Sequence, residues 1–166
     1  FFLFGYVNSL RHMFEPLDTL MRPGLPSLAG SSVSTIRRSL DVKTIMALFE
    51  SGYPCDLLIG HSKGNLVLSE ALYALKARRP GELTALADRA DIVTISARIA
   101  MPVAFRSVVD VMGALDGFGA MNSRLDIAVD VPVRGAWHHT NTELPMHLPV
   151  TEILRERVLP GLRSGG

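Results

Sequence analysis

The stretch Leu57-Leu58-Ile59-Gly60-His61-Ser62-Lys63-Gly64-Asn65 decides the fold, because a short apolar run enters a Gly-x-Ser-x-Gly turn there. Pro54 and Asp56 precede the run, as expected at the start of a buried strand. After the turn, apolar residues recur at the i, i+3, i+4, i+7 spacing of a helix that packs on a sheet. These residues are Leu68, Ala71, Leu72 and Leu75. The stretch therefore predicts a strand, a sharp turn and a helix.

The serine in this turn, Ser62, is a candidate nucleophile. A serine hydroxyl becomes nucleophilic when it is held exposed, close to a base and close to donors that stabilise an oxyanion. We expect Gly60 and Gly64 to be required because side chains there would collide with neighbouring backbone. The backbone N–H of Lys63 would stabilise the oxyanion at the helix N-terminus, where the dipole favours negative charge. The alternative is a glycine-rich turn whose serine is inert.

The composition bounds the class of protein. A chain of 166 residues with 48% hydrophobic residues predicts one globular domain with a substantial core. Its net charge is +1, with Lys and Arg spread along the chain, so we expect no nucleic-acid partner. Cys55 is the single cysteine, which excludes an intrachain disulfide and leaves the compartment open.

The N-terminal part begins with Phe1, without a Met or a leader pattern, so we expect a fragment or a processed chain. The apolar Phe1–Phe4 run is too short to span a bilayer, and no transmembrane segment is expected.

Residues 1–7 indicate the end of a strand or the first turn of a helix. If they form a strand, Gly5 lies where a second oxyanion donor is expected. Residues 8–30 are broken by Pro and Gly and predict either a lid or a loop with a satellite core.

Further elements follow from periodicity. Ser32 or Ser34 would cap a helix ending near Gly52. We expect a short helical segment over residues 82–89, a β-branched strand over 91–96, a helix over 104–115 and a weak third strand over 117–122. Strands that alternate with helices predict an α/β fold whose parallel sheet is covered on both faces. The face of the first helix would consist of Val42, Ile45, Met46 and Phe49.

The acid and the base are expected beyond the carboxyl ends of the later strands, where ligands of doubly wound sheets bind. The segments 122–132 and 137–149 hold several Asp and His residues there. The candidate acids are Asp126, Asp130 and Asp116, and the candidate bases are His147, His138 and His139.

No metal and no other cofactor is expected. The adjacent histidines of the second segment would point to opposite faces of a strand. Their spacing to Glu143 matches none of the common zinc signatures.

Over roughly residues 55 to 150 the chain resembles the lipase class 3, or fungal-lipase-like, branch of the α/β-hydrolase superfamily. The residues that carry the resemblance are Gly60-His61-Ser62-Lys63-Gly64, Asp126-Ile127 through Val131-Pro132, His139 to Glu143, and His147-Leu148. The sequence departs from the family's pattern by one extra residue between Asn122 and Asp126. Val129 stands for a proline, and Asn65 stands where a third glycine is common.

The resemblance implies a three-layer α/β-hydrolase-type parallel sheet, N-terminally truncated here because three strands are too few for it. It implies a triad of Ser62, Asp126 as acid and His147 as base, in the chain order of these hydrolases. It also implies cleavage of carboxylic esters with a lipid or other apolar acyl group through an acyl-enzyme, with transient contact to a lipid surface. Two rivals remain: a thioesterase or acyltransferase of the same fold, and a non-catalytic binding protein.

Overall fold

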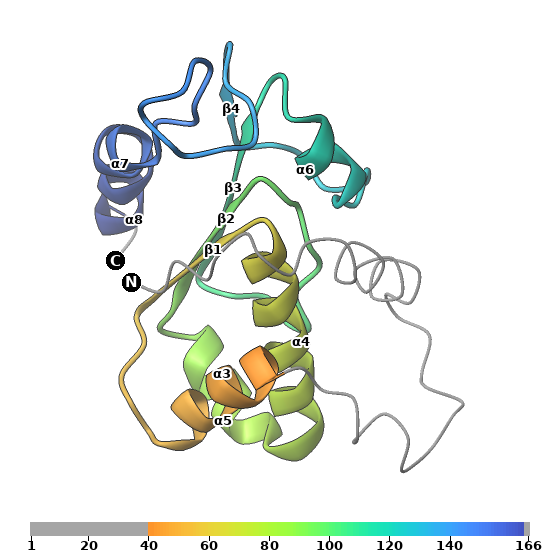
Figure 1. The fold of residues 1–166 in the computed structure, drawn as a ribbon. Helices are drawn as coiled ribbons and strands as arrows, with labels where there is room; N and C mark the ends of the chain where they lie inside the picture. Colours follow the sequence, from red (N-terminus) through yellow and green to blue (C-terminus); the bar gives the residue numbers. More distant parts are fainter. Residues whose placement is uncertain (1–39, 165–166) are drawn as a thin grey trace.

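The computed structural model describes residues 40–164 of the chain. Within them the strands form one all-parallel sheet in the order β1-β2-β3-β4 (Figure 1). The strands are β1 (Leu57–His61), β2 (Asp91–Ile95), β3 (Ser107–Gly113) and β4 (Val131–Val133). The expected α/β class with a parallel sheet is confirmed.

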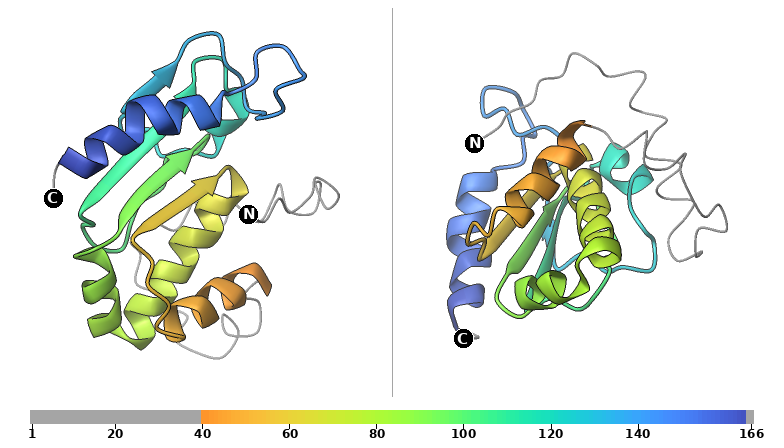
Figure 2. Two further views of the ribbon diagram at one scale, coloured as in Figure 1. Left: turned by 90° about the vertical axis from the view of Figure 1, so that its left-hand side faces the viewer. Right: turned by 90° about the horizontal axis from the view of Figure 1, so that it is seen from below.

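The helices lie on both faces of this sheet (Figure 2). They are α3 (Leu40–Glu50), α4 (Lys63–Arg78), α5 (Pro80–Ala87), α6 (Gly117–Met121), α7 (Val150–Ile153) and α8 (Leu159–Ser164). A π-helical turn, η1 (Leu154–Val158), joins α7 to α8, so that these three elements form one continuous helix.

Alternate side chains of the central strand β2 enter two different cores. Ile92 packs with the buried residues of α3, α4 and α5. Val93 and Ile95 pack on the opposite face with Ile153 and Val158. All five residues of β2 are buried, as expected for a parallel strand covered on both faces.

The helix after the serine turn is α4, and the prediction of its buried face is confirmed. Leu68, Ala71, Leu72 and Leu75 are all buried. The helix ends before Pro80, which begins α5, because proline lacks an N–H and its φ suits the first turn of a helix. In α3, Val42 and Met46 are buried as expected, whereas the proposed caps Ser32 and Ser34 lie outside the described residues.

The two expectations for residues 104–122 are wrong. Residues 107–113 form β3 instead of a helix, because their Val-rich run pairs along its length with β2. Phe105, Val108, Val109 and Met112 merely coincide with helical spacing. Residues 117–121 form the short helix α6 instead of a strand, because the Asp116 carboxylate accepts a hydrogen bond from Gly119 N at 2.6 Å and caps it.

Among residues 40–164, no helix has the length and apolar character needed to cross a bilayer. The expectations for residues 1–7, for Gly5 and for the lid or loop over residues 8–30 lie outside the described residues.

Of the two glycines in the serine turn, the structure leaves no room for a side chain at Gly60 and leaves room for one at Gly64. A Cβ at Gly60 would lie 2.1 Å from Asn65 Oδ1 and 3.1 Å from Asn65 Cα, whereas a Cβ at Gly64 meets no described atom within 4 Å. The expected collision is therefore confirmed at Gly60 and is absent at Gly64.

We predict that Gly60→Ala lowers the free energy of unfolding by about 1–3 kcal/mol, because the buried Asn65 has to move. Gly64→Ala serves as the matched control. This substitution should raise the free energy of unfolding by no more than about 1 kcal/mol, since alanine favours a helix. Urea unfolding of both variants measures the difference. Equal destabilisation by the two substitutions would contradict the assigned contact.

Candidate active site

Ser62 lies in a strained turn between β1 and α4. Its φ and ψ angles are 52° and −119°, a conformation that costs a residue with a side chain about 1–3 kcal/mol. The turn is held by a hydrogen bond from Ser62 N to Ile95 O at 2.8 Å and one from Asn65 N to Ser62 O at 3.0 Å. The Ser62 side chain is half-buried in this geometry.

Asn65 fastens this turn to the neighbouring strand. Its side chain is fully buried, and Nδ2 donates to Ile95 O at 2.9 Å and to Ala97 O at 3.1 Å. A glycine at this position could not make these bonds. The departure noted in the sequence therefore has a structural role, since Asn65 ties the start of α4 to the end of β2.

The Ser62 hydroxyl lies beside a histidine of the loop after β4. Ser62 Oγ is 2.9 Å from His138 Nε2, and His138 Nδ1 is 2.8 Å from Asp116 Oδ1. An ionised carboxylate only accepts hydrogen bonds, so Nδ1 carries the proton and Nε2 is free to accept from the hydroxyl. The three side chains thus form a continuous chain of hydrogen bonds with a base next to the serine.

Asp116 is held as a carboxylate. Its side chain is fully buried, and burial alone would raise its pKa. The hydrogen bonds from His138 and from Gly119 N–H outweigh burial, so the pKa lies below the usual value. The Ser96 hydroxyl also lowers this pKa, although its Oγ does not reach hydrogen-bonding geometry with the described atoms. Asp116 can therefore stabilise an imidazolium at His138.

The topology brings these residues together. Ser62 follows β1, Asp116 follows β3 and His138 follows β4, and the carboxyl ends of parallel strands meet at one edge of the sheet (Figure 2). Gly113, at the end of β3, permits the close approach of the two loops, because a Cβ there would lie 2.4 Å from Ala136 O. Leu115 N then donates to the same carbonyl oxygen at 3.0 Å.

The structure does not bring the expected acid to Ser62. Asp126 is exposed and pairs with Arg124, whose Nε and Nη2 lie 2.9 and 2.6 Å from its two oxygens. This hydrogen-bonded pair lowers the pKa of Asp126. Asp130, the second candidate, accepts from Asp110 N at 2.8 Å. Both residues lie in the connection from α6 to β4, and the hydrogen bonds of the described residues join the His138 imidazole to Asp116 instead of Asp126.

The expected base, His147, is likewise not beside Ser62. His147 Nδ1 lies 3.2 Å from Leu144 O, and His139 Nε2 lies 3.1 Å from Pro145 O. Both hydrogen bonds are local to one loop. The histidine that meets the serine is His138, one of the alternatives that the sequence left open.

One signal in the sequence could have identified the acid. Asp116 follows the Val-rich segment 107–113, and an Asp just beyond a strand lies at the edge of a parallel sheet where ligands bind. The helical spacing of the same segment conceals this relation, because a residue after a helix is not expected at that edge.

The Lys63 side chain points to α3, where Nζ lies 3.9 Å from Asp41 Oδ2. It therefore does not act as a base for Ser62. The Lys63 backbone N–H lies in the first turn of α4, where N–H groups lack partners within the helix. This group is available to an anion that forms at the serine.

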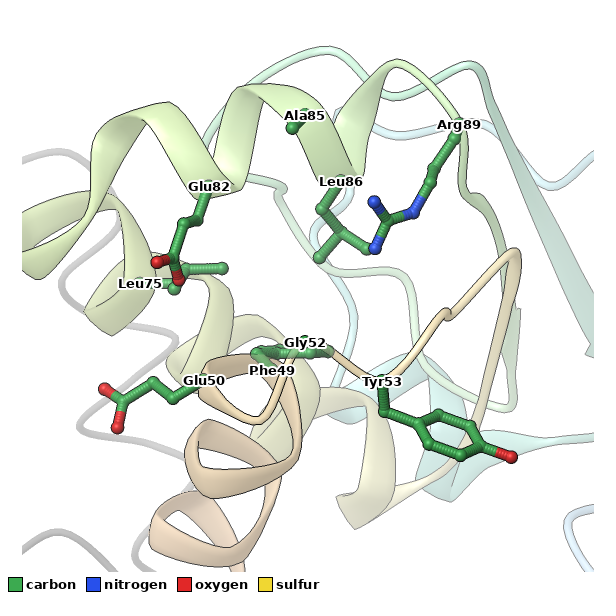
Figure 3. A pocket seen from close by; sticks show the side chains of 9 residues that line it. All are labelled: Phe49, Glu50, Gly52, Tyr53, Leu75, Glu82, Ala85, Leu86 and Arg89. Carbon is green, nitrogen blue, oxygen red and sulfur yellow. The ribbon is translucent and has the colours of Figure 1, made fainter.

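A cavity of about 250 Å³ lies at the other end of the sheet. Figure 3 shows Leu86 and Arg89 extending from α5 and the turn after it toward the loop with Gly52 and Tyr53. This loop precedes β1 and Arg89 precedes β2, so the cavity lies at the amino ends of the strands, away from Ser62. Among the described residues, no three His, Cys, Asp or Glu side chains are grouped to hold a metal ion.

Comparison of the chain with protein-family models, with curated proteins and with solved structures gives no match. The interpretation of Ser62, His138 and Asp116 therefore depends on their own geometry.

Proposed function

We propose that the protein is a serine hydrolase that cleaves carboxylic esters through an acyl-enzyme on Ser62. The observation that carries the proposal is the continuous Ser62–His138–Asp116 hydrogen-bond chain, with distances of 2.9 and 2.8 Å, on a strained turn. Strained backbone conformations of this kind are concentrated at functional sites. The half-buried hydroxyl with a base in contact argues against a protein that only binds a ligand.

The reaction follows from the geometry. His138 Nε2 takes the hydroxyl proton as Ser62 Oγ attacks the ester carbonyl, and the Asp116 carboxylate stabilises the resulting imidazolium. The Lys63 N–H stabilises the oxyanion of the tetrahedral intermediate. His138 then gives its proton to the leaving alkoxide, which departs as the alcohol. Water, deprotonated by His138, hydrolyses the acyl-enzyme and restores the serine.

The arrangement of the sheet supports an α/β-hydrolase-type fold as part of the proposal. In that fold the nucleophile follows a strand through a strained strand-to-helix turn, and the triad occurs in the chain order Ser, acid, His. Ser62, Asp116 and His138 have this order and follow β1, β3 and β4. The resemblance to class 3 lipases now depends on the serine turn, because the other two positions differ from those that the resemblance implies.

Two exposed aromatic side chains favour an apolar substrate. The Phe118 ring lies edge-on to the His138 ring, with centroids 5.9 Å apart, and Trp137 lies 5.9 Å from Phe118. Phe118 is 44% exposed and Trp137 38% exposed, so both offer apolar surface next to the base. We infer that an acyl or alkyl group of the ester lies against them.

The proposed nucleophile predicts covalent labelling. A fluorophosphonate probe should modify the chain, because its phosphorus accepts the attack of an activated serine. Labelling should disappear in Ser62→Ala, as seen by intact-mass measurement. A wild-type chain that is folded by circular dichroism and remains unlabelled would contradict the proposal.

The proposed acid and base predict a contrast between matched variants. His138→Ala and Asp116→Asn should each lower kcat for p-nitrophenyl butyrate by about 10³- to 10⁴-fold, since they remove the base or its correct tautomer. His147→Ala and Asp126→Asn, the same substitutions at residues whose hydrogen bonds go to Leu144 and Arg124, should leave kcat within about twofold. Steady-state kinetics on the four variants decide between the two assignments, and the reverse pattern would restore the assignment from sequence.

The aromatic surface predicts a chain-length effect. Phe118→Ala should reduce the preference for p-nitrophenyl butyrate over the acetate, because two methylenes lose part of their apolar contact, worth about 0.8 kcal/mol each when fully buried. Met121→Ala is the control, since this exposed apolar residue lies on the same helix without a ring contact to His138. The ratio of kcat/KM for the two esters measures the preference, and an unchanged ratio in Phe118→Ala would refute the contact.

A further inference from the structure

The residue before the nucleophile, His61, also contacts the base. His61 Nε2 lies 3.1 Å from the backbone carbonyl oxygen of His138, and the two imidazole rings are 5.3 Å apart between centroids. A carbonyl oxygen only accepts, so Nε2 of His61 carries the hydrogen and donates it. Two consecutive residues of the serine turn therefore bind His138. His61 binds the main-chain carbonyl of His138, and Ser62 binds the imidazole ring of His138.

The hydrogen bond from His61 holds the backbone carbonyl of His138, which the other hydrogen bonds among the described residues of the loop do not bind. Within the loop, Trp137 N donates to Met146 O at 2.7 Å and Leu148 N donates to His139 O at 2.8 Å. These bonds hold the residues on either side of His138. The His138 ring is oriented by Asp116 and Ser62, and its carbonyl is bound by His61.

We propose that His61 is a positioning residue that keeps the His138 backbone at the distance from which its ring reaches both Ser62 and Asp116. The inference rests on the proposed function, because the position of the His138 ring matters for the rate only if His138 acts as the base. A base has to stay within hydrogen-bond reach of the proton that it removes, and small displacements lower the rate.

The electrostatics of His61 agree with this role. Burial lowers its pKa, and the electrostatic interaction with the His138 side chain acts in the same direction, while the hydrogen bond to the His138 carbonyl and the Asp116 carboxylate oppose them. The net pKa lies below the usual value, so His61 remains neutral near pH 7. A neutral imidazole donates the hydrogen bond without placing a second positive charge beside the His138 imidazolium.

The hydrogen bond can be removed and restored by substitution. His61→Leu keeps the bulk of the side chain and loses the donor, whereas His61→Gln places an amide N–H at a similar reach. We expect His61→Leu to lower kcat for p-nitrophenyl butyrate roughly threefold to tenfold, the range for one hydrogen bond in partly exposed surroundings, with KM little changed. His61→Gln should recover kcat to within about twofold of wild type. The inference is wrong if kcat of His61→Leu equals wild type or if His61→Gln is as slow as His61→Leu.

A measurement without turnover separates this inference from the proposed function. The proton on His138 Nδ1, hydrogen-bonded to Asp116, is observable by proton NMR of the ¹⁵N-labelled full chain. Its signal should broaden by faster exchange with water in His61→Leu and stay sharp in His61→Gln. His147→Leu is the matched control and should leave it unchanged.

The outcomes distinguish the two claims. A wild-type chain that neither reacts with fluorophosphonate nor cleaves esters defeats the proposed function. The NMR signal still decides whether His61 positions His138 in that case, and an unchanged signal in His61→Leu defeats the inference alone.

Discussion

The His138 ring is the constraint on which the arrangement of the site depends. A neutral imidazole has one donor and one acceptor, and here both are used, the donor on Asp116 and the acceptor on Ser62. The ionised state of Asp116 therefore determines the tautomer of His138, which in turn determines that the Ser62 hydroxyl donates. Ser62, Asp116 and His138 come from three segments that are far apart in the sequence. These segments must keep their relative positions for the two hydrogen bonds to persist.

The parallel sheet supplies that rigidity. Asp116 and His138 come from loops that leave β3 and β4, and these strands pair from Val111 to Gly113. Gly113 allows backbone contact between the loops, and the hydrogen bond from Ala114 N to Val133 O, at 2.9 Å, extends the pairing beyond the sheet. Rigid elements position reacting groups more accurately than free loops do. Here the loops are fastened to one another where they leave the strands.

The sequence predicted the features that depend on local pattern. The strand, the serine turn and α4 follow from Leu57 to Leu75, because each signal lies within a few residues of the structure that it specifies. The segment with Val108 and Val109 fits helix and strand equally well, and its pairing with β2 decides between them. Pairing is non-local, so local periodicity could not identify β3, and Asp116 was not recognised as a residue that follows a strand.

The same limitation explains the choice of histidine. His138 and His147 are both loop histidines after the last strand, and residue type does not distinguish them. What distinguishes them is distance from β4: His138 lies five residues after Val133, while the chain turns back before His147, where Trp137 N binds Met146 O. The serine turn adds a second difference between the two histidines, because His61 donates a hydrogen bond to the backbone carbonyl of His138. Two adjacent side chains of the turn, His61 and Ser62, thus contact His138, so the geometry of the turn includes more than the position of the serine.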